Sequence, residues 1–390
     1  MAGKLQRLSS ALRTGIAVAM LTVTTYAAAQ GLRGDHPDTY VVQRGDTLWD
    51  IAGQFLQKPW LWPEIWQANP QIRNPHLIYP GDVISLAYLN RVGLTAGPRT
   101  DAAPINAIPL SEVEPFLKDL RVVDGFDHMP YVVGLEEDRL RASRGQVAYV
   151  KGLAGASPGT RYTVLRPTVR YTHLLRSGFC CDTFGRDELD ATGRRQVDWG
   201  QYWANVVMPD KGQEELGHEL MRVTAGTVTR GEVDGIQAST LLLDEEGREV
   251  RIGDRLVPVD AQPYDLQFFP HPPAQQTGYG KARVLAVTDM LTSGGPRDVV
   301  ALSIGAREGV DNGTVFSIWR EGTNTIDRVH KGLDRDEDTV FFENKVRLPD
   351  EFAGHVMVFR TFDRMSYGLV MDSIKPSRVG YHLKHPDATH

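Results

Sequence analysis

Apolar and polar residues follow two different patterns along this chain of 390 residues. Between residues 40 and 86, apolar positions recur with a helical period in the middle and form short runs at both ends. From about residue 130 to residue 382, runs rich in Val, Ile, Tyr and Phe alternate with Gly, Pro and Asp, which is typical of strands and turns. The chain is therefore predicted to be multidomain, with a small α+β module followed by a mainly-β region.

The start of the small module predicts a strand, a turn and a helix. Residues 40–42 have high strand propensity, and residues 44–46 form a turn sequence in which glycine can adopt a positive φ. Thr47 and Asp50 have the spacing of a capping box at the start of a helix. One buried stripe of that helix would consist of Leu48, Ile51, Ala52 and Phe55.

The rest of the module predicts a second helix and a returning strand. Pro63 suits the first turn of a helix, and Asn69 precedes a proline that ends it. Residues 79–82 form a Pro-Gly turn, and residues 83–86 form the second strand. The apolar face of this helix would consist of Leu61, Ile65 and Ala68. The predicted order is β-α-α-β.

The turn sequences Gly-Asp-Thr-Leu at 45–48 and Ile-Tyr-Pro-Gly-Asp at 78–82, placed around two helical patterns, resemble the LysM domain. This family binds glycans that contain N-acetylglucosamine, and the resemblance implies a shallow groove between the two turns. By the resemblance, the glycan-binding residues are Gly45, Asp46, Thr47, Leu48, Ile78, Tyr79, Pro80 and Gly81. The apolar contact with the sugar is assigned to Leu48, Ile78 and Tyr79. The alternative is a motif that only completes the fold.

The module departs from the family pattern between and after its helices. These segments are longer than usual and carry three tryptophans, which alter the expected shape of the groove. The tryptophans are Trp60, Trp62 and Trp66.

The N-terminal residues 1–29 combine basic residues with a short apolar run and three alanines before Gln30, which predicts a cleaved signal peptide and a periplasmic protein. The run is shorter than the ~20 residues that span a bilayer, so no transmembrane segment is expected in the mature chain; an uncleaved anchor is the alternative. Losing the three basic side chains changes the net charge from −6 to −9 (−6 − 3), which argues against a nucleic-acid partner.

The β-rich region carries two similar blocks, residues 155–166 and 309–320, that share the pattern Gly-x-x-x-Gly-Thr. A second pair of similar segments begins at Gly217 and Gly354. These blocks predict duplicated β modules, packed as small barrels or sandwiches. The predicted division is a module at 38–88, a linker at 89–110, a first β-rich module at 111–260 with an insert at 167–215, a connector at 261–280, and a second β-rich module at 281–386 with an insert at 321–352.

No set of residues indicates catalysis, a metal or a cofactor. Gly217-His218-Glu219 lacks the second histidine of a zinc-binding helix, and Gly-x-Ser-x-Gly does not occur. The two cysteines, Cys180 and Cys181, are adjacent and could form only a strained disulfide; a redox pair, a metal pair or a cysteine peptidase site is the alternative to two ordinary small residues. We therefore expect no enzyme activity.

These features predict a non-catalytic protein of the cell envelope. Its LysM-like module would bind peptidoglycan strands, and its β modules would serve as a spacer or bind an envelope protein partner. The alternative is a cell-wall hydrolase or peptidase that uses the module as a targeting anchor.

Overall fold

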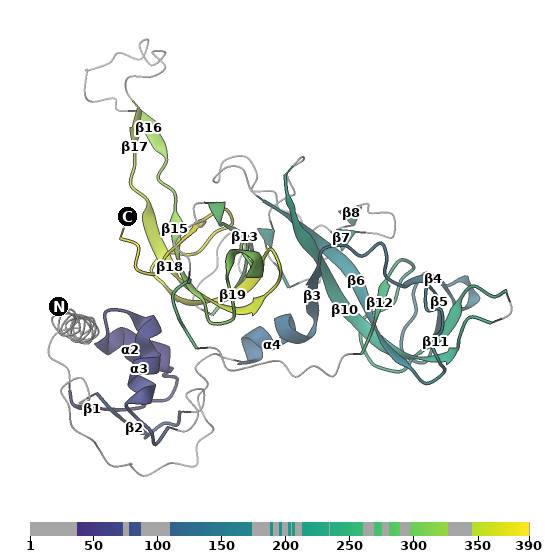
Figure 1. The fold of residues 1–390 in the computed structure, drawn as a ribbon, viewed down its shortest axis with the longest axis horizontal. Coiled ribbons are helices and arrows are strands. Elements are labelled where there is room, and N and C mark those ends of the chain that lie inside the picture. The colour runs from purple at the N-terminus through teal and green to yellow at the C-terminus, as the bar shows by residue number, and fades with distance from the viewer. Residues whose placement is uncertain are drawn as a thin grey trace, which may run out of the picture. The chain divides into compact units, whose positions relative to one another are not determined.

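The fold is seen in a computed structural model of the chain (Figure 1). The structure describes residues 37–72, 78–86, 110–173, 188–189, 195–196, 202–203, 205–206, 213–233, 235–259, 269–274, 281–288, 297–326 and 345–389. The predicted signal peptide, both cysteines and all of the predicted linker except Leu110 lie outside these residues. The chain divides into two compact units, residues 1–109 and 110–390.

The first unit has the predicted β-α-α-β order. Its elements are β1 (Thr39–Val41), α2 (Leu48–Phe55), the 3-10 helix η1 (Pro59–Leu61), α3 (Trp62–Gln67) and β2 (Val83–Ser85). The two strands pair antiparallel, with Tyr40 opposite Ile84. Trp60 and Trp62 fill the interior, with 5% and 1% of their surface exposed. The longer segment between the helices therefore folds as the extra turn η1 and adds aromatic core.

The second unit begins with a helix and a strand that precede two groups of strands. It starts with α4 (Leu110–Lys118) and β3 (Leu120–Val123). The helix begins at Leu110 and contains Pro115. The first group of strands is β4 (Tyr131–Leu135), β5 (Val147–Lys151), β6 (Arg161–Thr172), β10 (Glu215–Arg230), β11 (Ser239–Leu243) and β12 (Arg255–Pro258), with the 3-10 helix η3 (Glu136–Asp138) after β4.

These six strands form a closed sheet, because the last strand of the pairing order also pairs with the first. The antiparallel order is β11, β5, β4, β12, β6 and β10, and β10 pairs again with β11. We call this closed group the first barrel. Its interior is a cluster of buried aliphatic side chains that includes Val132, Val164, Val228 and Leu256. β3 lies outside the cycle and pairs with β10.

The second group of strands follows the same pairing order. It consists of β13 (Val284–Val287), β14 (Val299–Leu302), β15 (Val315–Arg320), β18 (Glu351–Thr361), β19 (Ser366–Ser373) and β20 (His382–Lys384), with the 3-10 helix η5 (Ala306–Glu308) between β14 and β15. The order is β20, β15, β18, β19, β14 and β13. An antiparallel bridge between Arg283 and His382 joins the ends, and we call this group the second barrel. Its core includes Val300, Phe316 and Val358.

Glycines hold matching positions in the two barrels. Gly159 and Gly313, at φ 91° and 102°, precede β6 and β15, and each donates its N–H to a carbonyl of the next long strand. Gly159 bonds Val228 at 2.8 Å, and Gly313 bonds Val358 at 2.7 Å. Before the last strands, Gly253 and Gly380 donate to the first strand of their own barrel, both at 2.8 Å.

The second pair of similar segments is out of register. Gly354 lies opposite Ile318, and the equivalent place in the first barrel, opposite Val164, is held by Thr224. The predicted match between Gly217 and Gly354 is therefore wrong by seven positions (224 − 217). Gly217 lies nearer the start of β10, opposite Tyr171.

Segments inserted between the long strands are shorter than predicted. β6 continues through Thr172 and β10 begins at Glu215, so residues 173–214 form the first insert; it contains β7 (Glu188–Leu189), β8 (Arg195–Gln196) and β9 (Asn205–Val206). The second insert is residues 321–350, and its strands β16 (Asn324–Ile326) and β17 (Lys345–Arg347) extend away from β15 and β18 (Figure 1). No helix in the described ranges is long and apolar enough to cross a membrane.

Candidate glycan-binding site

The two turns of the small module have the same backbone geometry. In residues 43–46 and 79–82, the third residue is a glycine with positive φ, 99° at Gly45 and 94° at Gly81. In each turn the fourth residue donates its N–H to the carbonyl of the first, at 3.2 Å and 2.9 Å. A positive φ at the third position defines a type II turn and favours glycine. The sequence therefore encodes two copies of one turn.

An aspartate closes each turn from the same position. The carboxylate of Asp46 accepts the N–H of Gln43 at 2.8 Å, and the carboxylate of Asp82 accepts the N–H of Tyr79 at 3.0 Å. Asp46 also accepts the hydroxyl of Tyr40 at 2.7 Å. Burial and this carboxylate raise the pKa of the Tyr40 phenol. Both aspartates thus stabilise backbone turns.

Backbone hydrogen bonds hold the two turns against each other. Val42, which precedes the first turn, donates its N–H to the carbonyl of Asp82 at 2.9 Å. The N–H of Gly81 donates to the carbonyl of Val42 at the same distance. Because these bonds join the beginning and end of the module, the predicted groove residues come together around one fixed seam.

The capping box orients the helix that leaves the first turn. The hydroxyl of Thr47 accepts the N–H of Asp50 at 3.0 Å, and the Asp50 carboxylate accepts the N–H of Thr47 at 3.2 Å. These bonds satisfy two N–H groups that a helix start leaves without partners. The predicted capping box is confirmed.

The predicted glycan-binding residues differ in exposure. Gly45 is exposed, and Asp46, Tyr79, Pro80 and Gly81 are partly exposed. Thr47 is 8% exposed and acts as the helix cap.

Two predicted sugar contacts are instead part of the core. The side chains of Leu48 and Ile78 are fully buried at 0%, so they do not offer an apolar surface to a sugar. Of the three residues assigned to apolar contact, only Tyr79 is partly exposed.

Asn69 supports the site from inside the module, a role that its sequence position before a proline does not reveal. Its amide donates to the carbonyls of Ile65 at 2.7 Å and Ser85 at 2.9 Å, and its oxygen accepts the N–H of Ser85 at 2.7 Å. The indole of Trp66 donates to the carbonyl of Ile72 at 2.6 Å. The Asn69 bonds tie the end of the second helix to β2, and the Trp66 bond holds the segment that follows this helix.

A second cluster of polar side chains surrounds Glu219 in the second unit. This carboxylate is 1% exposed and has four donors. They are the Thr168 hydroxyl at 2.8 Å, the Tyr171 hydroxyl at 2.9 Å, the Trp203 indole at 2.7 Å and the Tyr367 hydroxyl at 2.7 Å. Burial raises the pKa of Glu219, and the four hydrogen bonds oppose that rise. The cluster is closed to solvent, so we assign it a structural role.

The histidine beside Glu219 belongs to a different environment. His218 has its Nε2 2.8 Å from a carboxylate oxygen of Glu215, and its ring meets Phe126 edge to face. Within the described ranges, no group of three or more histidine, cysteine or acidic side chains could hold a metal ion.

Comparison with known proteins identifies the small module. The family model described as LysM domain matches residues 40–87, so the chain contains a LysM domain, as the turn sequences indicated. The chain is also similar to a protein of Bacillus subtilis (strain 168) described as Uncharacterized protein YqbP, with 40% identity over 60 residues. That match covers 13% of this chain and 27% of the relative. LysM domains imply binding of carbohydrate of the peptidoglycan or chitin type and typically occur in cell-envelope proteins.

Proposed function

We propose that this protein is a non-catalytic component of the cell envelope that binds peptidoglycan strands through the groove between its two LysM turns. The observation that carries the proposal is the seam at Val42, which holds the two glycine turns side by side with backbone groups and Tyr79 accessible. Glycine lets a ligand approach the backbone closely, and N–H and C=O groups can bond the acetamido group of N-acetylglucosamine.

The binding should be weak for one domain and insensitive to salt. A shallow groove buries little area against the entropy cost of association, so we expect a dissociation constant on the order of 10–1000 µM for one domain. Several molecules on one sacculus would bind more tightly through multivalency. Because the proposed contacts include no ion pair, screening by salt should have little effect.

We also propose that the two barrels arose by duplication and serve as a spacer or as a scaffold for an envelope protein partner. The shared pairing order supports the duplication, and so do the matching bonds of Gly159 and Gly313. The periplasm is the proposed location, on the strength of the signal-peptide pattern. Mass spectrometry of the exported protein should find an N-terminus near Gln30, whereas an intact Met1 would contradict it.

Sedimentation with purified peptidoglycan sacculi tests the function. The chain from residue 30 should pellet with sacculi at low and at moderate salt, while the chain from residue 110, which lacks the LysM domain, should stay in solution. If the chain from residue 30 stays in solution at both salt concentrations, the proposal is contradicted. Zymography tests the alternative, since a hydrolase would clear embedded peptidoglycan and the proposed protein would not.

A further inference from the structure

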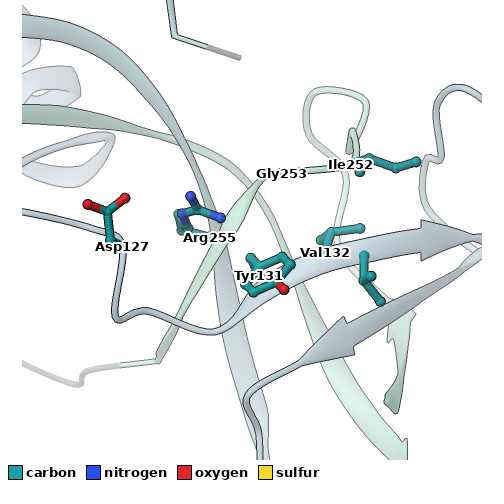
Figure 2. Close-up of a pocket in the computed structure, with 7 residues that line it drawn as sticks. Asp127, Tyr131, Val132, Ile252, Gly253 and Arg255 are labelled. Carbon is teal, nitrogen blue, oxygen red and sulfur yellow. The ribbon is translucent and has the colours of Figure 1, made fainter. Parts of the chain in front are cut away.

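A cavity opens on the first barrel where the start of β4 meets the start of β12. Its volume is about 250 Å³, and its lining includes Asp127, Tyr131, Val133, Ile252 and Arg255 (Figure 2). Pockets for drug-sized ligands commonly have about 300–1000 Å³, so this one suits a smaller molecule. Its lining residues all lie outside the LysM domain, so it is a separate site from the proposed glycan groove.

The charged group of the cavity is a buried arginine without an acceptor. Arg255 is 7% exposed, and in the part of the chain that the structure describes its guanidinium has no hydrogen bond or ion pair, with Nε fully enclosed. Its charge lies over the rings of Phe126 and Tyr131, 4.9 Å and 5.3 Å from their centres. Burial lowers the pKa of Arg255. An arginine with five donors and no acceptor at this depth is costly unless a ligand supplies an anion.

The residue before Arg255 pairs with a different buried arginine of this barrel. Asp254 accepts two hydrogen bonds from Arg166, both at 2.9 Å, and Arg166 also donates to the carbonyl of Glu249 at 2.6 Å. Three N–H groups of Arg166 are therefore paired with protein acceptors. The Asp254 carboxylate therefore bonds Arg166, and among the described residues it makes no hydrogen bond or ion pair with Arg255.

In the second barrel, the residue equivalent to Arg255 is paired with a carboxylate. Leu256 and Leu383 make matching bonds to the carbonyls of Pro130 and Ala282, which places His382 where the first barrel has Arg255. His382 has its Nε2 2.8 Å from a carboxylate oxygen of Glu321. This position thus holds a paired side chain in the second barrel, and in the first barrel it holds an arginine without a hydrogen-bond acceptor among the described residues.

The rest of the cavity adds an acid and an apolar wall. Asp127 is exposed beside Arg255, and it makes no ion pair with it among the described residues (Figure 2). Val133 and Ile252 are 44% and 52% exposed, which leaves aliphatic surface next to the charges. Asp127 would repel a simple anion. A ligand with a positive group close to its carboxylate would pair with both Asp127 and Arg255.

We propose that this cavity binds an amino-acid head group, with the ligand carboxylate on Arg255, its ammonium group beside Asp127 and an aliphatic side chain over Val133 and Ile252. The planar guanidinium has the geometry to bind a carboxylate through two parallel hydrogen bonds. A free amino acid and a short peptide share this chemistry, and they differ in the separation of their charges.

Saturation-transfer NMR with the chain from residue 30 tests the site. The probes are leucine, leucinamide (no carboxylate), N-acetylleucine (no ammonium) and leucyl-leucine (charges further apart). We expect leucine or leucyl-leucine to bind, and the tighter of the two shows whether the ligand is a free amino acid or a short peptide. Leucinamide and N-acetylleucine should both bind at least tenfold more weakly. Absence of transfer to leucine and leucyl-leucine alike would overturn the proposal.

Arg255→Met keeps much of the apolar stem and should weaken binding of the preferred probe at least tenfold. The matched control is Arg141→Met, on the exposed surface of the same barrel, which should bind as wild type does. Without ligand, Arg255→Met should melt at or above the temperature of the wild type, because it removes an unpaired buried charge. A folded Arg255→Met that binds as tightly as wild type would contradict the proposal.

Discussion

The hydroxyl of Tyr367 donates to the carboxylate of Glu219 across 2.7 Å, joining a strand of the second barrel to a strand of the first. The two residues lie 148 positions apart in the sequence. Phe116 of α4 packs against the rings of both Tyr367 and Trp203, with centres 6.1 Å and 5.3 Å away. Arg360 of the second barrel donates to carbonyls of α4, including Leu117 at 2.9 Å. Glu219 is therefore the polar centre of the contact between the barrels.

Removing this carboxylate should destabilise the second unit strongly. We expect Glu219→Ala to lower its free energy of unfolding by about 3–5 kcal/mol, because four buried donors lose their acceptor and a cavity forms. Urea denaturation followed by tryptophan fluorescence measures the effect. Glu246→Ala is the control, since that side chain is 85% exposed, and it should change stability by less than about 0.5 kcal/mol. Equal losses in the two variants would contradict a central role for Glu219.

The raised pKa of Glu219 predicts a defined pH dependence. The fold favours the protonated carboxyl, so its stabilising contribution is complete below the ordinary pKa of 4.5 and is lost as pH rises through the higher pKa of the folded state. Glu219→Gln cannot ionise and should remove this dependence. Urea denaturation at about pH 4.5 and about pH 8 should show wild type losing stability relative to Glu219→Gln as pH rises. A constant difference would contradict the shift.

The Glu219 cluster marks the limit of what the sequence could predict. Its four donors lie 51, 48, 16 and 148 residues away, so no local pattern brings them together. The sequence drew attention to His218 and Glu219 only as part of an incomplete metal motif. In the structure they lie on successive positions of β10, and neighbouring residues of a strand point to opposite faces. Because of this long-range packing, Glu219 belongs to the buried cluster and His218 does not.

The capping residue of the LysM domain should contribute a measurable part of its stability. Thr47→Ala removes the acceptor of the Asp50 N–H and should cost about 1 kcal/mol, whereas Thr47→Ser keeps the hydroxyl and should cost less. Thermal denaturation of the full chain, followed by helical circular dichroism, measures both. Equal melting curves for Thr47→Ala and wild type would show that the box is not stabilising.

Substitution of Gly45 should destabilise the first glycine turn through backbone strain and not through a clash of the new side chain with its neighbours. A Cβ at Gly45 would meet no atom within 4 Å, yet φ is +99° there. We expect Gly45→Ala to destabilise the LysM domain by about 1–3 kcal/mol and Gly45→Asn by less, because asparagine tolerates positive φ better. Denaturant unfolding of both variants tests this order. An alanine variant at least as stable as the asparagine variant would contradict it.

The LysM domain was predictable because its signals are local. The capping box, both glycine turns and the stop before Pro70 each lie within a few residues, and each occurs in the structure. Burial was less predictable, since Leu48 and Ile78 read as groove residues from the family pattern but face the core. Exposure depends on how the two helices pack on the strands, and a one-dimensional pattern does not specify that.

Sedimentation of the Tyr79→Ala chain with peptidoglycan sacculi is the most direct test of the glycan groove. Tyr79 is the one side chain assigned to apolar sugar contact that remains accessible, so its loss should weaken binding while leaving the turn and its aspartate in place. The control is Leu140→Ala, an exposed apolar residue of the second unit at 87% exposure. We predict that Tyr79→Ala leaves most protein in solution while Leu140→Ala and wild type pellet alike. A Tyr79→Ala chain that pellets as completely as wild type would contradict the account.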